Sequence, residues 1–122
     1  MRLGQPRGRP IAAGAEIDRY CLQNDVPPRT KYRIRLAFEE LAQQMLWPLL
    51  DRTGVRITVE YAAAEAQTTV TARYGGGRFD PAEGENELSY AVLSKSVEEM
   101  NYSFDPERED ANIIRVLIRE KA

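Results

Sequence analysis

Two alternating segments joined by a short link constrain the fold of this chain more than any other feature. In both Val55–Ala62 and Gln67–Tyr74, apolar side chains recur at alternate positions. A period of two is the spacing of a half-buried β-strand. Because only residues 63–66 separate the two segments, they predict an antiparallel hairpin.

The remaining segments predict three helices and two further strands. Apolar residues at three- and four-residue steps predict a helix from about Arg29 to Trp47, which Pro48 kinks or ends. The other predicted elements are a helix over 11–24, a loop over 75–86, a helix over 87–100, and strands over 101–104 and 112–119. This order predicts an α+β fold. We expect a two-layer sandwich with a mixed or antiparallel sheet of four to five strands and about three helices on one face.

The length of the chain is that of one domain. It has 122 residues, of which 43% are hydrophobic. We expect a single domain over 11–122, preceded by a flexible segment or domain junction over 1–10 that is rich in Arg, Gly and Pro. No apolar run approaches the roughly 20 residues that span a bilayer. We therefore expect a cytoplasmic protein without membrane insertion.

Histidine is absent and cysteine occurs once, at Cys21. The lack of histidine excludes Ser-His-Asp and Cys-His catalysis and every metal site that needs an imidazole. One cysteine cannot form an intramolecular disulfide or a thiolate zinc site. Cys21 lies in the first predicted helix, where a packed core thiol is the expected role and a reactive thiol is the alternative.

Charge is distributed unevenly along the sequence. Residues 1–35 carry eight Lys or Arg against three Asp or Glu, whereas residues 36–122 carry nine against sixteen. A basic segment suits nucleic acid or an acidic partner, or it is a solvated tail followed by a helix start. Because no interleaved aromatic residues mark a surface for stacking bases, we expect no nucleic-acid partner.

Four segments together resemble a known family. The hairpin runs into Gly75-Gly76-Gly77-Arg78-Phe79-Asp80-Pro81, a glycine turn followed by Phe-Asp-Pro. The helix before it carries Glu40 and Gln44 four residues apart, and segments 87–93 and 100–104 follow it. This pattern resembles the GHKL (Bergerat-fold) ATPases, in the version of the anti-sigma factor serine kinases, over nearly the whole chain. The resemblance implies a Bergerat-like fold whose active members use ATP and Mg²⁺.

The resemblance assigns roles to two residues of the second predicted helix. Glu40 stands at the position of the glutamate that activates the attacking hydroxyl, although a solvated helix edge also explains it. Gln44 replaces the asparagine that holds magnesium. Its amide oxygen lies one methylene farther out, and magnesium demands near-ideal octahedral geometry.

Four further positions of the resemblance lie in the glycine turn. Tyr74 replaces the aspartate that accepts a hydrogen bond from adenine, and its bulk would occupy the space of the base. Gly76 matches the first glycine of the motif, and the glycines on either side add freedom at positive φ. Arg78 stands at the second glycine, where it would contact a phosphate or reach solvent. Asp80 begins a turn with the following proline. The expected nucleotide-contacting positions are therefore Gln44, Tyr74, Gly76, Arg78 and Asp80.

Three carboxylates stand where the resemblance places the triphosphate. Glu83, Glu85 and Glu87 surround the start of the third predicted helix, and the family's glycines are missing there. Like charges at this place oppose phosphate binding. Acidic residues at a helix start are also ordinary partners of the helix dipole.

These departures predict a degenerate ATPase domain. We expect a regulatory protein-interaction module of bacterial signalling, with no cofactor and without ordinary ATP hydrolysis or kinase activity. Its partner would be another protein or an adjoining domain of a longer chain, and a homodimer is a further arrangement. The alternative is an active serine/threonine protein kinase of the anti-sigma factor type. It would bind ATP and Mg²⁺, with Glu40 as the base and Gln44 on the metal.

Overall fold

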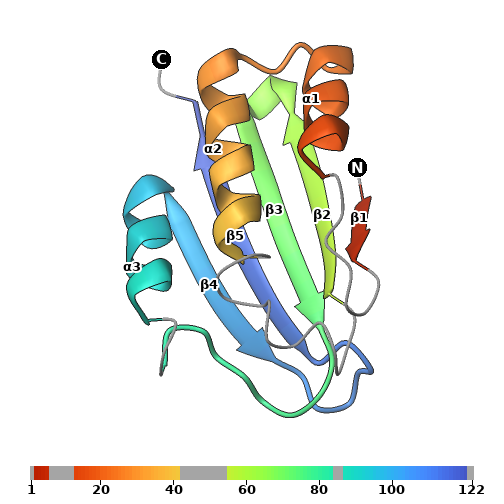
Figure 1. Cartoon of the computed structure of the whole chain (residues 1–122), viewed down its shortest axis with the longest axis vertical. Helices are drawn as coiled ribbons and strands as arrows, with labels where there is room; N and C mark the ends of the chain where they lie inside the picture. Colours follow the sequence, from red (N-terminus) through yellow and green to blue (C-terminus); the bar gives the residue numbers. More distant parts are fainter. Residues whose placement is uncertain (1, 6–12, 42–54, 84–86, 121–122) are drawn as a thin grey trace.

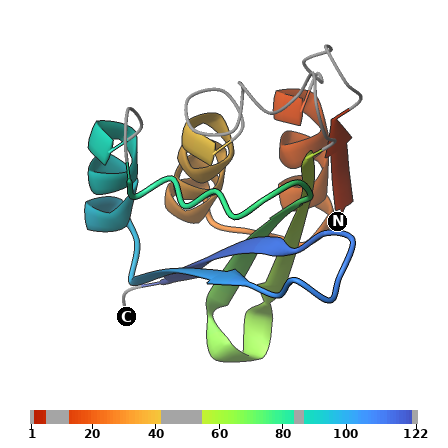
Figure 2. The same ribbon diagram turned by 90° about the horizontal axis from the view of Figure 1, so that it is seen from below.

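The computed structural model describes residues 2–5, 13–41, 55–83 and 87–120. It is a two-layer α+β fold with a five-stranded sheet and three helices on one face (Figures 1 and 2), as the sequence predicts. The elements are β1 (Arg2–Gln5), α1 (Ala13–Gln23), α2 (Pro28–Phe38), β2 (Val55–Ala62), β3 (Gln67–Tyr74), α3 (Glu87–Ser96), β4 (Glu99–Phe104) and β5 (Asn112–Arg119). No helix in the described part of the chain is long and apolar enough to cross a membrane.

The predicted hairpin forms the middle of the sheet. The strand order is β1-β2-β3-β5-β4, and each neighbouring pair is antiparallel. Val55 lies opposite Tyr74 and Ala62 lies opposite Gln67, so β2 and β3 pair along their full length. The link is one 3₁₀ turn that ends at Ala66 with a φ of 50°. The structure thus confirms both strands with the predicted bounds.

The core lies between the sheet and the helices. Residues at alternate positions of β2, β3 and β5 are buried, and Ile34, Ala37 and Phe38 of α2 are buried too. The inward-facing residues of the three strands are Val55, Ile57, Val59, Thr68, Val70, Ala72, Tyr74, Asn112, Ile114, Val116 and Ile118. All but Thr68 and Asn112 are apolar or aromatic, so these two polar positions stand out within the buried layer.

Two predicted boundaries differ from the structure. The third helix ends at Ser96 instead of about 100, and β4 begins at Glu99 instead of 101. Pairing with β5 explains both shifts, because Glu98 N–H donates to the carbonyl of Leu117 and Met100 already faces Val116. The second helix is regular over Pro28–Phe38, then widens into a looser turn at residues 39–41. Its predicted continuation to residue 47, and Pro48, lie outside the described residues.

The N-terminal strand is an element that the sequence did not predict. Arg2–Gln5 pairs with β2 in antiparallel register, where the sequence indicated a flexible segment over 1–10. A short strand at a sheet edge takes its backbone hydrogen bonds from its neighbour, so its own composition carries little signal. Residues 6–10 lie outside the described part of the chain.

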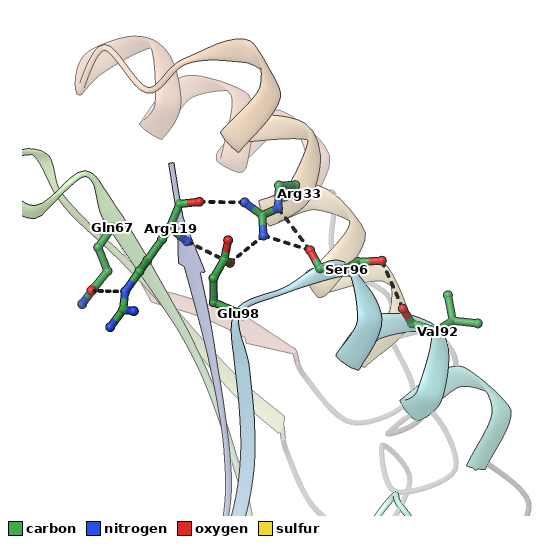
Figure 3. A network of polar contacts seen from close by, with 6 residues as sticks. All are labelled: Arg33, Gln67, Val92, Ser96, Glu98 and Arg119. Atoms are coloured by element: carbon green, nitrogen blue, oxygen red, sulfur yellow. Dashed lines mark hydrogen bonds and ion pairs between the residues drawn. The ribbon is translucent and has the colours of Figure 1, made fainter. Parts of the chain in front are cut away.

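Arg33 joins both layers at the end of the sheet where α2 begins. Its guanidinium donates to the carbonyl of Ser96 at the end of α3 (3.0 and 3.1 Å) and to the carbonyl of Arg119 at the end of β5 (2.9 Å). It also pairs with the carboxylate of Glu98 at 2.6 Å. Figure 3 shows these contacts converging on one side chain. Arg33 therefore connects α2, the α3–β4 junction and the last strand.

Glu98 is held ionised by this network. Burial opposes ionisation, but hydrogen bonds from the Arg119 N–H and the Arg33 guanidinium outweigh it and lower the pKa of Glu98. The side chains of Arg33 and Glu98 are 19% and 24% exposed, so water screens the pair only in part.

The lowered pKa predicts acid sensitivity. Because folding lowers the pKa of Glu98, its stabilising contribution is complete above the unfolded pKa, near 4.5, and is lost as the pH falls through the folded value. Glu98→Gln should lower the free energy of unfolding by about 1–2 kcal/mol at pH 7. It should also flatten the decline of stability below about pH 4.5. Urea unfolding at several pH values measures both effects.

Glu99→Gln is the matched control, since Glu99 is the exposed neighbour of Glu98 at the start of β4. It should change the stability at pH 7 by less than about 0.5 kcal/mol. Parallel acid profiles for the parent and Glu98→Gln would contradict this account of the network.

Candidate functional site

Tyr74 is the last residue of β3 and points into the core. Its side chain is 0% exposed, on the same face of β3 as Val70 and Ala72. The hydroxyl donates to the carbonyl of Phe79 at 2.6 Å, and the two rings meet edge to face with centroids 6.4 Å apart. Burial, with smaller contributions from Tyr102 and Asp80, raises the pKa of Tyr74 far above its ordinary value. The phenol is thus a neutral part of the core that closes the glycine turn.

Asn112, the first residue of β5, holds the glycine turn from the opposite strand. Its side-chain N–H groups approach three carbonyls, those of Tyr74 and Gly75 at 3.3 Å and that of Gly77 at 3.1 Å. Its Oδ1 accepts from the Phe79 N–H at 3.0 Å and from the hydroxyl of Tyr102. The Phe79 N–H can only donate, which identifies the atom facing it as oxygen. One fully buried amide therefore bonds to four backbone groups of this turn.

Gly76 is the point at which the turn needs a glycine. Its φ is +84°, and among the described glycines it is the one with positive φ. A Cβ added there would meet no atom within 4 Å, so the requirement comes from the backbone conformation and not from packing. The glycines on both sides have the same conformational freedom but do not adopt positive φ.

The polar side chains after the glycines interact mainly with one another. Arg78 lies over the ring of Tyr102, 5.6 Å from its centroid, and pairs with Asp80 at 3.8 Å and Glu83 at 3.6 Å. Asp80 accepts from the Ala82 N–H through its side chain and from the Glu83 N–H through its carbonyl. This confirms the turn predicted at Asp80. Arg78 is half exposed and meets the acidic side chains of its own loop.

The predicted site residues fall into three groups. Tyr74, Gly76, Arg78 and Asp80 lie together in the glycine turn. Glu40 is partly buried in the wide turn that follows α2. Gln44, the predicted magnesium ligand, lies outside the described residues, as does Glu85. The described part of the chain holds no group of three Cys, Asp or Glu side chains suited to a metal ion.

Asn112 and Tyr102 are the site residues that the sequence analysis missed. Asn112 is in phase with Ile114, Val116 and Ile118, so a polar residue at an inward-facing position of the last strand was the available signal. Tyr102 alternates in the same way with Met100 and Phe104 on β4. Neither position shows, from the sequence alone, which distant backbone groups need a partner.

Cys21 has the surroundings of a core thiol. It is 2% exposed, and burial raises the pKa of its thiol, with Lys31 opposing this and Asp18 reinforcing it. A buried thiol with a raised pKa is a poor nucleophile, because the thiolate is the reactive form.

The chain matches no protein-family model, and a search of curated proteins found no match.

The Asn112 contacts predict a large effect of removing the amide. Asn112→Ala should lower the free energy of unfolding by about 3 kcal/mol, because it leaves buried carbonyls without their side-chain donor and leaves the Phe79 N–H only its 3.3 Å contact with the Tyr102 hydroxyl. Asn101→Ala, at an exposed position of β4, is the control and should cost less than about 0.5 kcal/mol. Chemical denaturation measures both. Equal small effects would show that Asn112 does not hold the turn.

Proposed function

We propose that this chain is a degenerate GHKL-type ATPase domain that acts as a regulatory protein-interaction module, without ordinary ATP hydrolysis or kinase activity. The sequence resemblance and the two-layer α+β fold both support a relationship to these ATPases. The proposal includes a bacterial signalling setting and a cytoplasmic location. The partner is another protein or an adjoining domain of a longer chain.

The burial of Tyr74 is the observation that carries this proposal. In the family that the sequence resembles, an aspartate at this position accepts a hydrogen bond from adenine. Here an aromatic ring fills the corresponding place at the end of β3, and its hydroxyl is already bonded to Phe79. A nucleotide base could enter only by displacing this ring, which would expose core surface and break the contact with Phe79.

The closed hydrogen bonding of the turn supports the same conclusion. Nucleotide-binding glycine turns present backbone groups to their ligand. In this turn, the carbonyls of Gly75 and Gly77 and the N–H of Phe79 bond to Asn112 instead. Glu83 adds a carboxylate beside Arg78, which reduces the attraction of that cation for phosphate.

Exposed apolar side chains on the helices support a role in protein interaction. On α3, Leu88 is 76% exposed and Val92 is 44% exposed, and their spacing of four residues places them on one side of the helix. On α2, Tyr32 is 68% exposed. Large apolar groups of this kind are favourable contacts when another protein covers them.

Nucleotide titration tests the proposal. The parent protein should show no saturable binding of ATP below about 1 mM, a limit that corresponds to roughly 4 kcal/mol of binding free energy. Tyr74→Ala opens the space, and Tyr74→Asp also restores the acceptor. Because a hydrogen bond to a charged group contributes about 1.5–3 kcal/mol, Tyr74→Asp should bind ADP about 10- to 150-fold more tightly than Tyr74→Ala. Calorimetry with and without Mg²⁺ measures these affinities.

Tyr61→Ala is the matched control, since Tyr61 is a half-buried tyrosine near the other end of the hairpin with its own hydroxyl contact, to Glu120. It should gain no nucleotide affinity. Circular dichroism establishes that each variant is folded. Micromolar, Mg²⁺-dependent ATP binding by the parent would contradict the proposal and favour the active kinase.

A further inference from the structure

A cavity of about 560 Å³ lies at the opposite end of the sheet from the glycine turn. It is lined by the start of α2, the end of α3, the residues that lead into β4, and Glu120 after β5. Arg119 pairs with Gln67 at this end, whereas Asn112 pairs with Tyr74 at the other. The seven residue steps from Asn112 to Arg119 span roughly 23 Å of strand. The cavity is therefore independent of the proposed loss of nucleotide binding.

The start of α2 presents unpaired donors to this cavity. Two prolines, Pro27 and Pro28, open the helix, and no side chain caps it. The first intrahelical bond runs from Lys31 N–H to the carbonyl of Pro27. The N–H groups of Arg29 and Thr30 come before that bond and have no acceptor within the described residues. Free N–H groups at a helix start attract anions.

Thr30 adds an independent sign of a ligand. Thr30 lines the cavity, and only 3% of the residue is exposed. A helical threonine commonly bonds back to the carbonyl four residues earlier, but the Thr30 hydroxyl makes no hydrogen bond in the part of the chain that the structure describes. The Thr30 hydroxyl is not among the fully enclosed side-chain atoms that lack a partner, so it keeps access to the cavity, where a ligand can bond to it.

Some charged side chains around the cavity have a partner, and others have no ion pair. Glu98 is engaged by Arg33 and by the Arg119 N–H (Figure 3), and Glu120 accepts from the hydroxyl of Tyr61. By contrast, the cations of Arg29 and Lys95 form no ion pair within the described residues. Glu120 has no ion pair in the described part of the chain either, so two cations and one carboxylate of the cavity lack a partner of opposite charge, and the cations are in excess.

From this arrangement we infer that the cavity at the start of α2 binds the phosphate group of a small phosphorylated molecule. The two backbone N–H groups, the Thr30 hydroxyl and the side chains of Arg29 and Lys95 are its donors. A tetrahedral dianion accepts several hydrogen bonds at once and gains from the positive end of the helix dipole. The cavity volume falls within the range of small-molecule sites and leaves room for an organic group beside the phosphate.

Titration of labelled protein with inorganic phosphate and with glycerol 3-phosphate, followed by amide NMR, tests this inference. Both probes should shift the amide signals of Arg29 and Thr30 with dissociation constants of about 1 mM or below. Tighter binding of glycerol 3-phosphate identifies a phosphorylated molecule as the ligand, and equal binding identifies the phosphate ion itself.

Three variants separate this site from general charge attraction. Thr30→Val keeps the shape of the side chain, removes the hydroxyl and should weaken binding about tenfold, as should Arg29→Gln and Lys95→Gln. Lys31→Gln removes a charge from the same helical turn but outside this cavity, and should change affinity less than about twofold. Arg29 and Lys95 are exposed, so their variants should fold normally.

Two results would overturn the inference. One is the absence of amide shifts at Arg29 and Thr30 with both probes at millimolar concentration. The other is an equal loss of affinity in Lys31→Gln and in the three cavity variants. That result would show that phosphate is attracted by the net charge of the helix and not by a specific binding site.

Discussion

The buried ring of Tyr74 is the contact on which the glycine turn depends. The tyrosine ends a central strand, fills core space between the sheet and the helices, and bonds through its hydroxyl to the backbone of Phe79. Asn112 then bonds to the carbonyls before Phe79 and to its N–H. Two side chains from neighbouring strands therefore determine the path of the turn, and the positive φ at Gly76 is the conformation that this path requires.

The two ends of the sheet use polar groups in different ways. At the glycine turn, Asn112 is fully buried and pairs with backbone groups, which gives a closed and neutral network. At the other end, Arg33 connects α2, the α3–β4 junction and β5 through one charged group. Donors beside this second network have no partner, and our inference of a phosphate site rests on that difference. Loss of one ligand site and presence of another are compatible, because they lie at opposite ends of the strands.

Sequence reasoning succeeded where one pattern stood alone. The alternation in β2 and β3 predicted both strands and their pairing, because only the hairpin buries those residues on one face. It failed where two patterns overlap. Residues 97–100 continue a helical segment, but Met100 also begins the alternation with Tyr102 and Phe104, and pairing with β5 decided the outcome. The role of Asn112 could not be predicted, since its partners lie about 35 positions earlier and need donors only in the folded chain.

The position of the Tyr74 ring in the presence of nucleotide tests the central claim most directly. NMR of labelled protein can follow the ring signals of Tyr74 and the amide of Phe79 while millimolar Mg-ATP is added. Our account predicts that both signals keep their positions, because the ring stays in the core and the Asn112–Phe79 bond stays closed. The contrary result is a saturable shift of both signals, with new contacts between adenine protons and the end of β3. It would show that the nucleotide displaces the ring and would contradict the account.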